Sequence, residues 1–411
     1  MADIKHLVMP EIKEHILKES VELKDEVIQL RRHFHRHPEL SYEEIETSLF
    51  ICNWLRINEI DFRKGIAGTG IIGTITGKAQ GKKVIAMRAE MDALPVTERN
   101  TTEYSSQNPG KMHACGHDAH LAMLMGTAKL LNSIREQFGG TVLFIFQPGE
   151  EKCPGGARLV IESGALKNPG PDIVIAQHIL PELETGKVGY KAGRYMASCD
   201  EIYITITGKG GHAALPGLTT DQIYIASNLI VRLKNRMSEV QITNQIPTVL
   251  GIGRISGEGA TNIIPEKVHI AGTFRTFDEK WRAEGLKLIR SVSVETAKEY
   301  GVSIEVNIAE GYPVLNNDEI LTSKAIEFSK VLLGKNKIET YTDIRMSSDD
   351  FSFYSALAPS LYYRIGIRKK DSEMLKLHTA DFDIDEDGLE TGVANLSWLV
   401  YNFLVQDPPG A

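Results

Sequence analysis

The pattern of apolar and polar residues divides the chain into helices and buried strands. Between residues 10 and 33, apolar residues recur at close to the helical period and Lys and Glu fill the other positions, which predicts an amphipathic helix. Short apolar runs at 83–87, 141–146 and 172–177 predict buried strands of a mostly parallel sheet. A helical pattern at 118–137 separates the first two runs, and this alternation is typical of an α/β domain.

The pattern changes near Gly186, where a second domain is expected. Apolar residues alternate with polar ones at 199–207, and the remaining elements follow as a helix at 220–237, strands at 245–254 and 267–276, a helix at 279–300 and a strand at 302–308. This βαββαβ order predicts a small sandwich with one helical face and one open sheet face. After about Gly311 the first pattern resumes, ending in a helix at 386–403. We therefore expect one domain of residues 1–187 and 311–411, interrupted by an inserted domain of residues 188–310.

Composition and charge exclude several classes of protein. The 411 residues are 42% hydrophobic and 24% charged, as in ordinary globular enzymes. The net charge of −8, without long basic runs, disfavours binding to nucleic acid or to anionic membranes. No apolar stretch is long enough to span a bilayer, and the first twenty residues lack the apolar core of a secretory signal. Four cysteines in so long a chain indicate a reducing compartment, so a cytoplasmic protein is expected.

The densest group of candidate ligands is the segment HACGHDAH at residues 113–120. It holds three histidines, a thiol and a carboxylate, which favours a metal site. Cys115 and His117 stand two residues apart, so their side chains share one side of an extended segment. The alternative interpretation is a His-rich surface loop beside a buried cysteine.

A second group, QPGEE at residues 147–151, follows the apolar strand at 141–146. Adjacent carboxylates repel each other, and a cation would relieve that repulsion. One of Glu150 and Glu151 would then coordinate the cation while the other carries protons. Taken alone, the segment is more often a solvated acidic loop. Its position at the carboxyl end of a buried strand favours a site, because ligands of open α/β sheets bind there.

Further donors stand at other strand ends: Glu90 and Asp92 after one strand, His178 at the end of another, and His378 after a loop that follows a strand-like segment. A single histidine is more often a core or surface residue than a ligand, but several at successive strand ends indicate a shared site. The N, O and S donors suit Zn, Mn, Co or Ni rather than Ca. No nucleophile elbow or phosphate-binding loop is present, and Cys115 fits better as a thiolate ligand than as a nucleophile.

Ten motifs follow one another along the chain: RRHFHRHPELSYEE, MRAEMDALPV, HACGHDAH, QPGEE, QHILP, GKGGHAALP, TNIIPE, GTFRTF, SSDDFSFY and LHTADF. With these motifs in this order, residues 26–403 resemble the aminoacylase/carboxypeptidase metallohydrolases. The sequence is most similar to the amidohydrolase branch with hippurate hydrolase, N-acyl-amino-acid amidohydrolases and plant indole-acetyl-amino-acid hydrolases. The resemblance implies a di-metal exopeptidase-like α/β domain with a mixed, mostly parallel sheet flanked by helices, and an inserted ferredoxin-like α+β lid and dimerisation domain.

The resemblance implies a di-metal site and assigns the general base to Glu150, which would activate a water. The implied metal ligands are Cys115, His117, Glu151, His178 and His378. Asp92 would orient a ligand histidine from behind. Glu90 stands where relatives carry His or, in this branch, Asp, so its role as a ligand stays open. Ser347 and Asp349 replace the Gly and Glu that this branch usually has.

In the family that the sequence resembles, the inserted domain is both a lid and the dimer interface. By this resemblance His212 would reach the partner subunit's active site and stabilise the oxyanion, while Asn262 and Arg275 would hold the substrate's carbonyl and carboxylate. An Arg suits bidentate recognition of a carboxylate. Without the resemblance, a surface His, a turn Asn and a strand Arg would be the preferred interpretation.

These observations predict a cytoplasmic, homodimeric amidohydrolase with two divalent transition-metal ions per subunit, Zn or Mn first and Co or Ni as alternatives. The predicted substrate is an N-acyl amino acid with an acetyl, benzoyl or other aryl or alkyl acyl group, cleaved to a carboxylic acid and a free amino acid. The alternatives are a dipeptidase or carboxypeptidase of the same superfamily, and a catalytically silent protein that binds amino-acid conjugates.

Overall fold

The computed structural model describes residues 10–406 and divides into two compact units. Within these residues, unit 1 consists of residues 10–193, 316–343 and 353–406, and unit 2 of Arg194–Leu315 and Ile344–Ser352. The boundaries therefore lie a few residues after those expected at 188 and 310, and unit 2 gains a segment that the sequence pattern did not assign to it. That segment belongs to unit 2 because its backbone binds there, with the N–H of Ala197 donating to the carbonyl of Arg345 at 3.0 Å.

Unit 1 is built on an eight-stranded mixed sheet, which confirms the expected α/β class. Its order is β1-β2-β4-β3-β5-β16-β6-β15. The central strands β4, β3, β5 and β16 are parallel to one another, while β1, β2 and β6 join by antiparallel pairing. The strands are β1 (Asp61–Ile66), β2 (Gly70–Thr76), β3 (Ala79–Glu90), β4 (Gly139–Gln147), β5 (Ile173–Glu184), β6 (Val188–Tyr190), β15 (Ile338–Thr340) and β16 (Ser360–Arg368).

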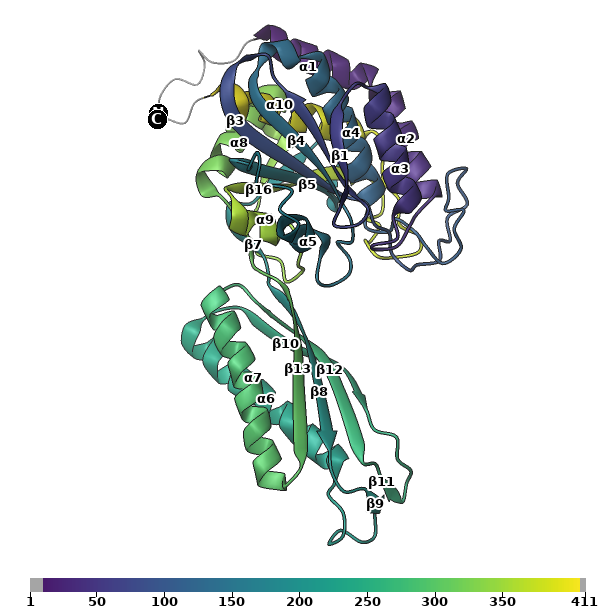
Figure 1. Ribbon diagram of the computed structural model, residues 1–411, viewed down its shortest axis with the longest axis vertical. Helices are drawn as coiled ribbons and strands as arrows, with labels where there is room; N and C mark the ends of the chain where they lie inside the picture. Colours follow the sequence, from purple (N-terminus) through teal and green to yellow (C-terminus); the bar gives the residue numbers. More distant parts are fainter. Residues whose placement is uncertain (1–9, 407–411) are drawn as a thin grey trace. The chain divides into compact units, whose positions relative to one another are not determined.

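The helices of unit 1 pack around this sheet (Figure 1). Helix α4 contacts α2, α10 and strand β3, and nearly all of its residues are buried. The single helix expected at 10–33 is two helices, because regular helix is interrupted at Leu23. The helices are α1 (Pro10–Glu22), α2 (Lys24–Arg36), α3 (Ile45–Ile57), α4 (His117–Ser133), α5 (Gly156–Glu162), α8 (Glu319–Leu333), α9 (Ser352–Leu357) and α10 (Gly388–Val405).

The strand register brings the predicted site residues of unit 1 to one level of the sheet. Glu90, the last residue of β3, pairs with Gln147, the last residue of β4. On the other side of β3, Arg88 pairs with Ala176, so that Glu90 is level with His178. The carboxyl ends of β3 and β4 therefore meet beside the middle of β5, where a ligand site of an open parallel sheet is expected.

Unit 2 is a four-stranded antiparallel sheet in the order β10-β12-β8-β13, with helices α6 and α7 packed on its strands. This order and the βαββαβ connections are those of a ferredoxin-like sandwich. Alternating Ile202, Ile204 and Ile206 of β8 point into its core, as their spacing predicts. The elements are β8 (Cys199–Thr207), α6 (Gln222–Asn244), β10 (Thr248–Ser256), β12 (Lys267–Thr276), α7 (Glu279–Tyr300) and β13 (Ser303–Tyr312).

Two pairs of short strands complete the description of residues 10–406. Strands β9 (Gly211–His212) and β11 (Ile263–Ile264) form a separate two-stranded ribbon in unit 2. Strands β7 (Gly193–Met196) and β14 (Leu315–Asn317) lie where the chain passes between the units. Among residues 10–406, no helix is both long and apolar enough to cross a membrane.

Candidate metal centre

Five side chains predicted as metal ligands converge in unit 1. The Sγ atom of Cys115 lies 3.7 Å from Nε2 of His178 and 3.3 Å from Nε2 of His378. Oε1 of Glu151 lies 3.4 Å from Nε2 of His378 and 3.9 Å from Nε2 of His117. The donor atoms form two compact triplets that share the Cys115 sulfur: Cys115, His117 and His178 in one, and Cys115, Glu151 and His378 in the other.

The backbone around Cys115 is shaped to bring these donors together. Gly116 has φ +82° and precedes the first residue of α4, His117. A Cβ at Gly116 would lie 2.2 Å from Cδ1 of Ile179, so only glycine fits there. His378 itself has φ 62°, a strained backbone for a non-glycine residue, and its N–H donates to the carbonyl of Ala114 at 2.8 Å. The distant loop that carries His378 is thus fixed beside Cys115.

Both buried ligand histidines have their rings oriented by backbone carbonyls. Nδ1 of His117 lies 2.8 Å from the carbonyl oxygen of Asp92, and Nδ1 of His178 lies 2.7 Å from that of Ile179. A carbonyl only accepts, so each Nδ1 carries a proton, and Nε2 is the nitrogen that each ring can offer to a cation in its neutral form. This is the second-shell arrangement found around metal-ligating histidines.

The carboxylate of Asp92 organises the loop that carries the two adjacent acids. Its Oδ1 accepts from the backbone N–H of Glu150 at 3.0 Å, and its Oδ2 accepts from that of Glu151 at 2.9 Å. The preceding N–H, that of Gly149, donates to Glu44 at 2.8 Å. His117 makes its close contact with Asp92 at the backbone carbonyl of Asp92 and not at the carboxylate. Glu44, which holds the same loop, was not predicted, since a single acid in a polar segment has no distinctive pattern.

The electrostatic balance of the site fits a cation. Burial and the charge of Glu151 raise the pKa of the Cys115 thiol to about 12. Burial also lowers the pKa of His178 well below its ordinary value, so its imidazole is neutral. Oε1 of Glu151 is buried and receives no hydrogen bond within residues 10–406. A divalent cation would stabilise the thiolate and would be bound by this oxygen together with the nearby His378 nitrogen, and the S, N and O donors suit a transition metal.

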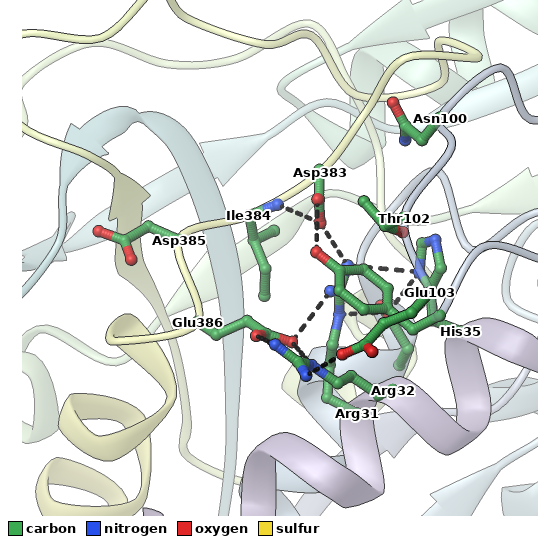
Figure 2. Close-up of polar contacts among 12 residues, drawn as sticks. Arg31, Arg32, His35, Asn100, Thr102, Glu103, Asp383, Ile384, Asp385 and Glu386 are labelled. Carbon is green, nitrogen blue, oxygen red and sulfur yellow. Dashed lines mark hydrogen bonds and ion pairs between the residues drawn. The ribbon is translucent and has the colours of Figure 1, made fainter. Parts of the chain in front are cut away.

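A buried charge network anchors the loops on either side of these ligands (Figure 2). The guanidinium of Arg31, on α2, binds Asp118 at 2.8 Å, and Asp118 directly follows His117 in α4. The same guanidinium binds Asp383 at 2.8 Å and Glu386 at 3.2 Å, in the segment that follows the His378 loop. Arg31 therefore ties both ligand-bearing segments to α2.

In unit 2, the structure brings His212 and Asn262 together on the ribbon of β9 and β11. His212 pairs with Ile263, and the N–H of Ala213 donates to the carbonyl of Asn262 at 3.0 Å. Both residues are exposed. Nδ1 of His212 accepts from the N–H of Ala214 at 3.1 Å, which places the ring proton on Nε2 and makes that nitrogen a hydrogen-bond donor.

The ribbon of β9 and β11 lies near one end of β12 (Figure 1). Arg275, the next-to-last residue of β12, is at the other end of that strand. From Lys267, at the ribbon end, to Arg275 the strand spans about 26 Å at roughly 3.3 Å per residue. The Arg275 guanidinium donates to the carbonyl of Met346 at 2.9 Å and to the hydroxyl of Ser348 at 3.3 Å. Within one copy of unit 2, therefore, Arg275 and the pair His212 and Asn262 are too far apart to touch one small substrate.

The two unusual residues of the SSDDF segment also have local partners in unit 2. The carbonyl of Ser347 accepts from the N–H of Ala197 at 3.1 Å, and Oδ1 of Asp349 accepts from the N–H of Phe351 at 2.8 Å. These contacts hold the segment that also binds Arg275.

Comparisons with known proteins identify the family. The model of peptidase family M20/M25/M40 matches residues 86–402. The chain belongs to this family. It is 40% identical over 309 residues to an N-acyl-L-amino acid amidohydrolase of Geobacillus stearothermophilus, covering 75% of this chain and 82% of the relative. It is 35% identical over 395 residues to thermostable carboxypeptidase 2 of Saccharolobus solfataricus, covering 94% of this chain and 98% of the relative.

A solved structure of a metal-binding relative has the same fold. The M20 chain superposes on a dinuclear metal-binding peptidase of the M20 family from Bacillus subtilis with a TM-score of 0.78 and 33% identity, covering 93% of this chain and 99% of that chain. The expected family and fold class are thereby confirmed, and the protein is a metal-dependent hydrolase of the amidohydrolase and peptidase class.

Proposed function

We propose that this M20 protein is a di-metal amidohydrolase that cleaves N-acyl amino acids to a carboxylic acid and a free amino acid. The observation that carries the proposal is the pair of donor triplets sharing Cys115, with Glu150 adjoining the ligand Glu151 in a loop held by Asp92. A site that only bound amino-acid conjugates would need neither the cations nor an acid positioned beside them.

The proposed cofactors are two divalent transition-metal ions per subunit, Zn or Mn in preference to Co or Ni. One would be held by Cys115, His117 and His178, and the other by Cys115, Glu151 and His378. When bound, such ions polarise an amide carbonyl and lower the pKa of a water toward neutrality.

Glu150 is the proposed general base. Its side chain is almost fully buried, and its backbone is fixed by Asp92. In the reaction the carboxylate of Glu150 takes a proton from the attacking water as the C–O bond forms. The same carboxyl then gives that proton to the amide nitrogen as the C–N bond breaks, so the amino acid leaves as a neutral amine.

His212, Asn262 and Arg275 are the proposed contacts to the substrate. The Nε2–H of His212 would donate to the oxyanion, Asn262 would hold the carbonyl, and Arg275 would bind the carboxylate. Since Arg275 lies about 26 Å along β12 from the ribbon, these residues can meet one substrate only if they come from two chains. This supports the proposed homodimer, with unit 2 as both lid and dimer interface.

The surface of the ribbon region agrees with a protein contact. Leu215, Leu218 and Ile263 lie close to His212 in sequence or pairing and are 51%, 59% and 53% exposed. Large exposed apolar residues gathered at one place indicate an interaction site. A cytoplasmic location remains a prediction from the composition.

A dipeptidase or carboxypeptidase is the second candidate, favoured by the similarity to thermostable carboxypeptidase 2. The two functions differ in whether the substrate's amine is acylated or free. Free-amine recognition needs an acidic contact in addition to the residues already assigned.

The proposal is tested by assaying N-acetyl-, N-benzoyl-, indole-acetyl- and long-chain acyl-amino acids beside matched dipeptides, each with Zn, Mn, Co and Ni. We expect turnover of at least one acyl class, its loss on chelation, and its return with a transition metal. Turnover of dipeptides alone would assign the carboxypeptidase function. Full activity after proven metal removal would exclude the mechanism.

A further inference from the structure

His120, the third histidine of the 113–120 segment, has no place in the proposed mechanism. It lies in the first turn of α4 and is fully buried, with donor atoms near those of Glu90 and His117. Taken by distance alone, these three residues could be a further metal site. The hydrogen bonds around His120 indicate a different role.

Both ring nitrogens of His120 already have partners. The backbone N–H of Ile179 donates to Nε2 at 3.0 Å, so Nε2 carries no proton. Nδ1 therefore holds the proton and donates it to Oε2 of Glu90 at 2.9 Å. His120 is thus a neutral Nδ1–H tautomer with no lone pair left for a metal ion.

Glu90 is held in turn by a buried cation. Its second oxygen, Oε1, accepts from Nη1 of Arg88, and Nε of Arg88 donates to Oε1 of Gln147 at 2.9 Å. Both oxygens of Glu90 are engaged, and Arg88 balances its charge inside the protein. These bonds give Glu90, whose role the sequence left open, a function as an anchor for His120.

The backbone of Ile179 links His120 to a proposed metal ligand. The N–H of Ile179 donates to His120, and the carbonyl of Ile179 accepts from Nδ1 of His178, the preceding residue, at 2.7 Å. The rings of His120 and His178 also contact each other, with centroids 4.5 Å apart. Holding the backbone of Ile179 on the N–H side of its Cα helps to fix the carbonyl on the other side, and with it the direction in which Nε2 of His178 points.

We propose that His120 is a positioning residue for the metal ligand His178. Glu90 sets the tautomer of His120, His120 holds the backbone of Ile179 through its N–H, and the carbonyl of Ile179 orients the His178 ring toward the site shared with Cys115. The inference rests on the proposed ligand set, in which His178 binds a metal ion and His120 does not.

The test compares zinc affinity and stoichiometry, measured by competition with a chromophoric chelator, in four single variants. His120→Leu removes both hydrogen bonds, whereas His120→Gln offers one donor and one acceptor. His113→Leu is the matched control, because His113 is equally buried in the same segment and neither of its ring nitrogens has a hydrogen-bond partner within residues 10–406. His178→Ala reports the loss of the ligand itself.

We expect His120→Leu to lower the affinity for one of the two zinc ions by about 10–100-fold, which is the range for residues that hydrogen-bond to metal ligands. His120→Gln should recover most of that loss, and His113→Leu should stay within a few-fold of the parent protein. His178→Ala should lose the same ion more completely. Folded His120→Leu protein with parental affinity for both ions, or equal losses in the Leu and Gln variants, would overturn the inference.

A second measurement uses the unmodified protein, so it holds even where a variant fails to fold. Nitrogen NMR of labelled histidines should show His120 as the Nδ1–H tautomer with and without zinc. With NMR-active cadmium, coupling should reach His178 and not His120. An Nε2–H tautomer, or coupling to His120, would overturn the proposed role. If His178→Ala still binds both zinc ions, then His178 is not a metal ligand, and the positioning role of His120 is excluded together with the proposed ligand set.

Discussion

In unit 1 the proposed ligands His117 and His178 are buried, and a backbone carbonyl fixes the ring of each. In unit 2 the residues proposed to contact the substrate, His212 and Asn262, are exposed on a ribbon of two-residue strands. Side chains that hold metal ions need fixed geometry, and a complete shell of hydrogen bonds supplies it. Exposed side chains must be ordered at the moment of binding, so the catalytic role proposed for the ribbon would require a second surface that orders His212 and Asn262.

The largest expected effect separates the two neighbouring acids of unit 1. Glu150→Gln removes the proposed base but keeps the shape of the loop, so kcat should fall by about 10²–10⁴-fold while metal content stays unchanged. Glu151→Gln removes a charged ligand and should lose metal as well as activity. Measuring the metal content and the kcat of both purified variants checks this division of roles. Two variants with normal metal content and normal turnover would show that base and ligand are wrongly assigned.

The sequence predicted that Glu90, Glu151 and His178 would lie near one another, because each follows an apolar run expected to be a parallel strand. His178 is close to the end of β3 as expected, although it lies inside β5 (Ile173–Glu184) and not at the strand end that the apolar run at 172–177 predicted. The full ligand set, with Cys115 and His378, came from the resemblance to the family. The sequence could not predict what holds them, because Glu44, Arg31 and His120 act through contacts between segments far apart in the chain. The register that makes Glu90 level with His178, for example, depends on the pairing of β3 with β5.

In the fold, the elements with strict periodicity were the easiest to predict. Cys199–Thr207, Lys267–Thr276 and Glu279–Tyr300 have the expected bounds. The interruption at Leu23 was missed because the apolar pattern continues through it. The segment Ile344–Ser352 was missed as part of unit 2 because its contacts there include backbone hydrogen bonds and a bond from Arg275 to the Ser348 hydroxyl, which leave no apolar pattern in the sequence.

A smaller effect is expected from breaking the buried network behind the ligands. Burial alone would raise the pKa of Asp118, but the Arg31 guanidinium and the bond to His35 hold it well below its ordinary value. Arg31→Met leaves this buried carboxylate uncompensated and should lower the free energy of unfolding by about 3–5 kcal/mol at neutral pH. Equilibrium unfolding in denaturant measures this change in the free energy of unfolding. Arg32→Met, on the same helix but partly exposed, is the control and should cost about 1 kcal/mol or less.

The sign of the pH dependence follows from the direction of that shift. Because the folded-state pKa of Asp118 is depressed, its contribution to stability is present above the unfolded pKa of about 3.9 and is lost as the pH falls below it. The difference in unfolding free energy between Arg31→Met and the parent protein should therefore shrink in acid. A difference that is independent of pH would show that Asp118 is not the charge Arg31 compensates.

The proposed role of the exposed residue His212 is tested by mixing subunits that carry different substitutions. His212→Ala removes one donor to the oxyanion and should lower kcat by about 10²–10³-fold. If His212 serves the other subunit, His212→Ala and Glu150→Gln proteins should regain activity when mixed and allowed to exchange. In each hybrid dimer one site has an intact Glu150 and receives an intact His212, while the other has neither. Random exchange of equal amounts should then restore roughly a quarter of all sites, by the counting of a two-fold dimer. A mixture no more active than its separate components, after exchange has been demonstrated, would place His212 in its own chain's site or in none.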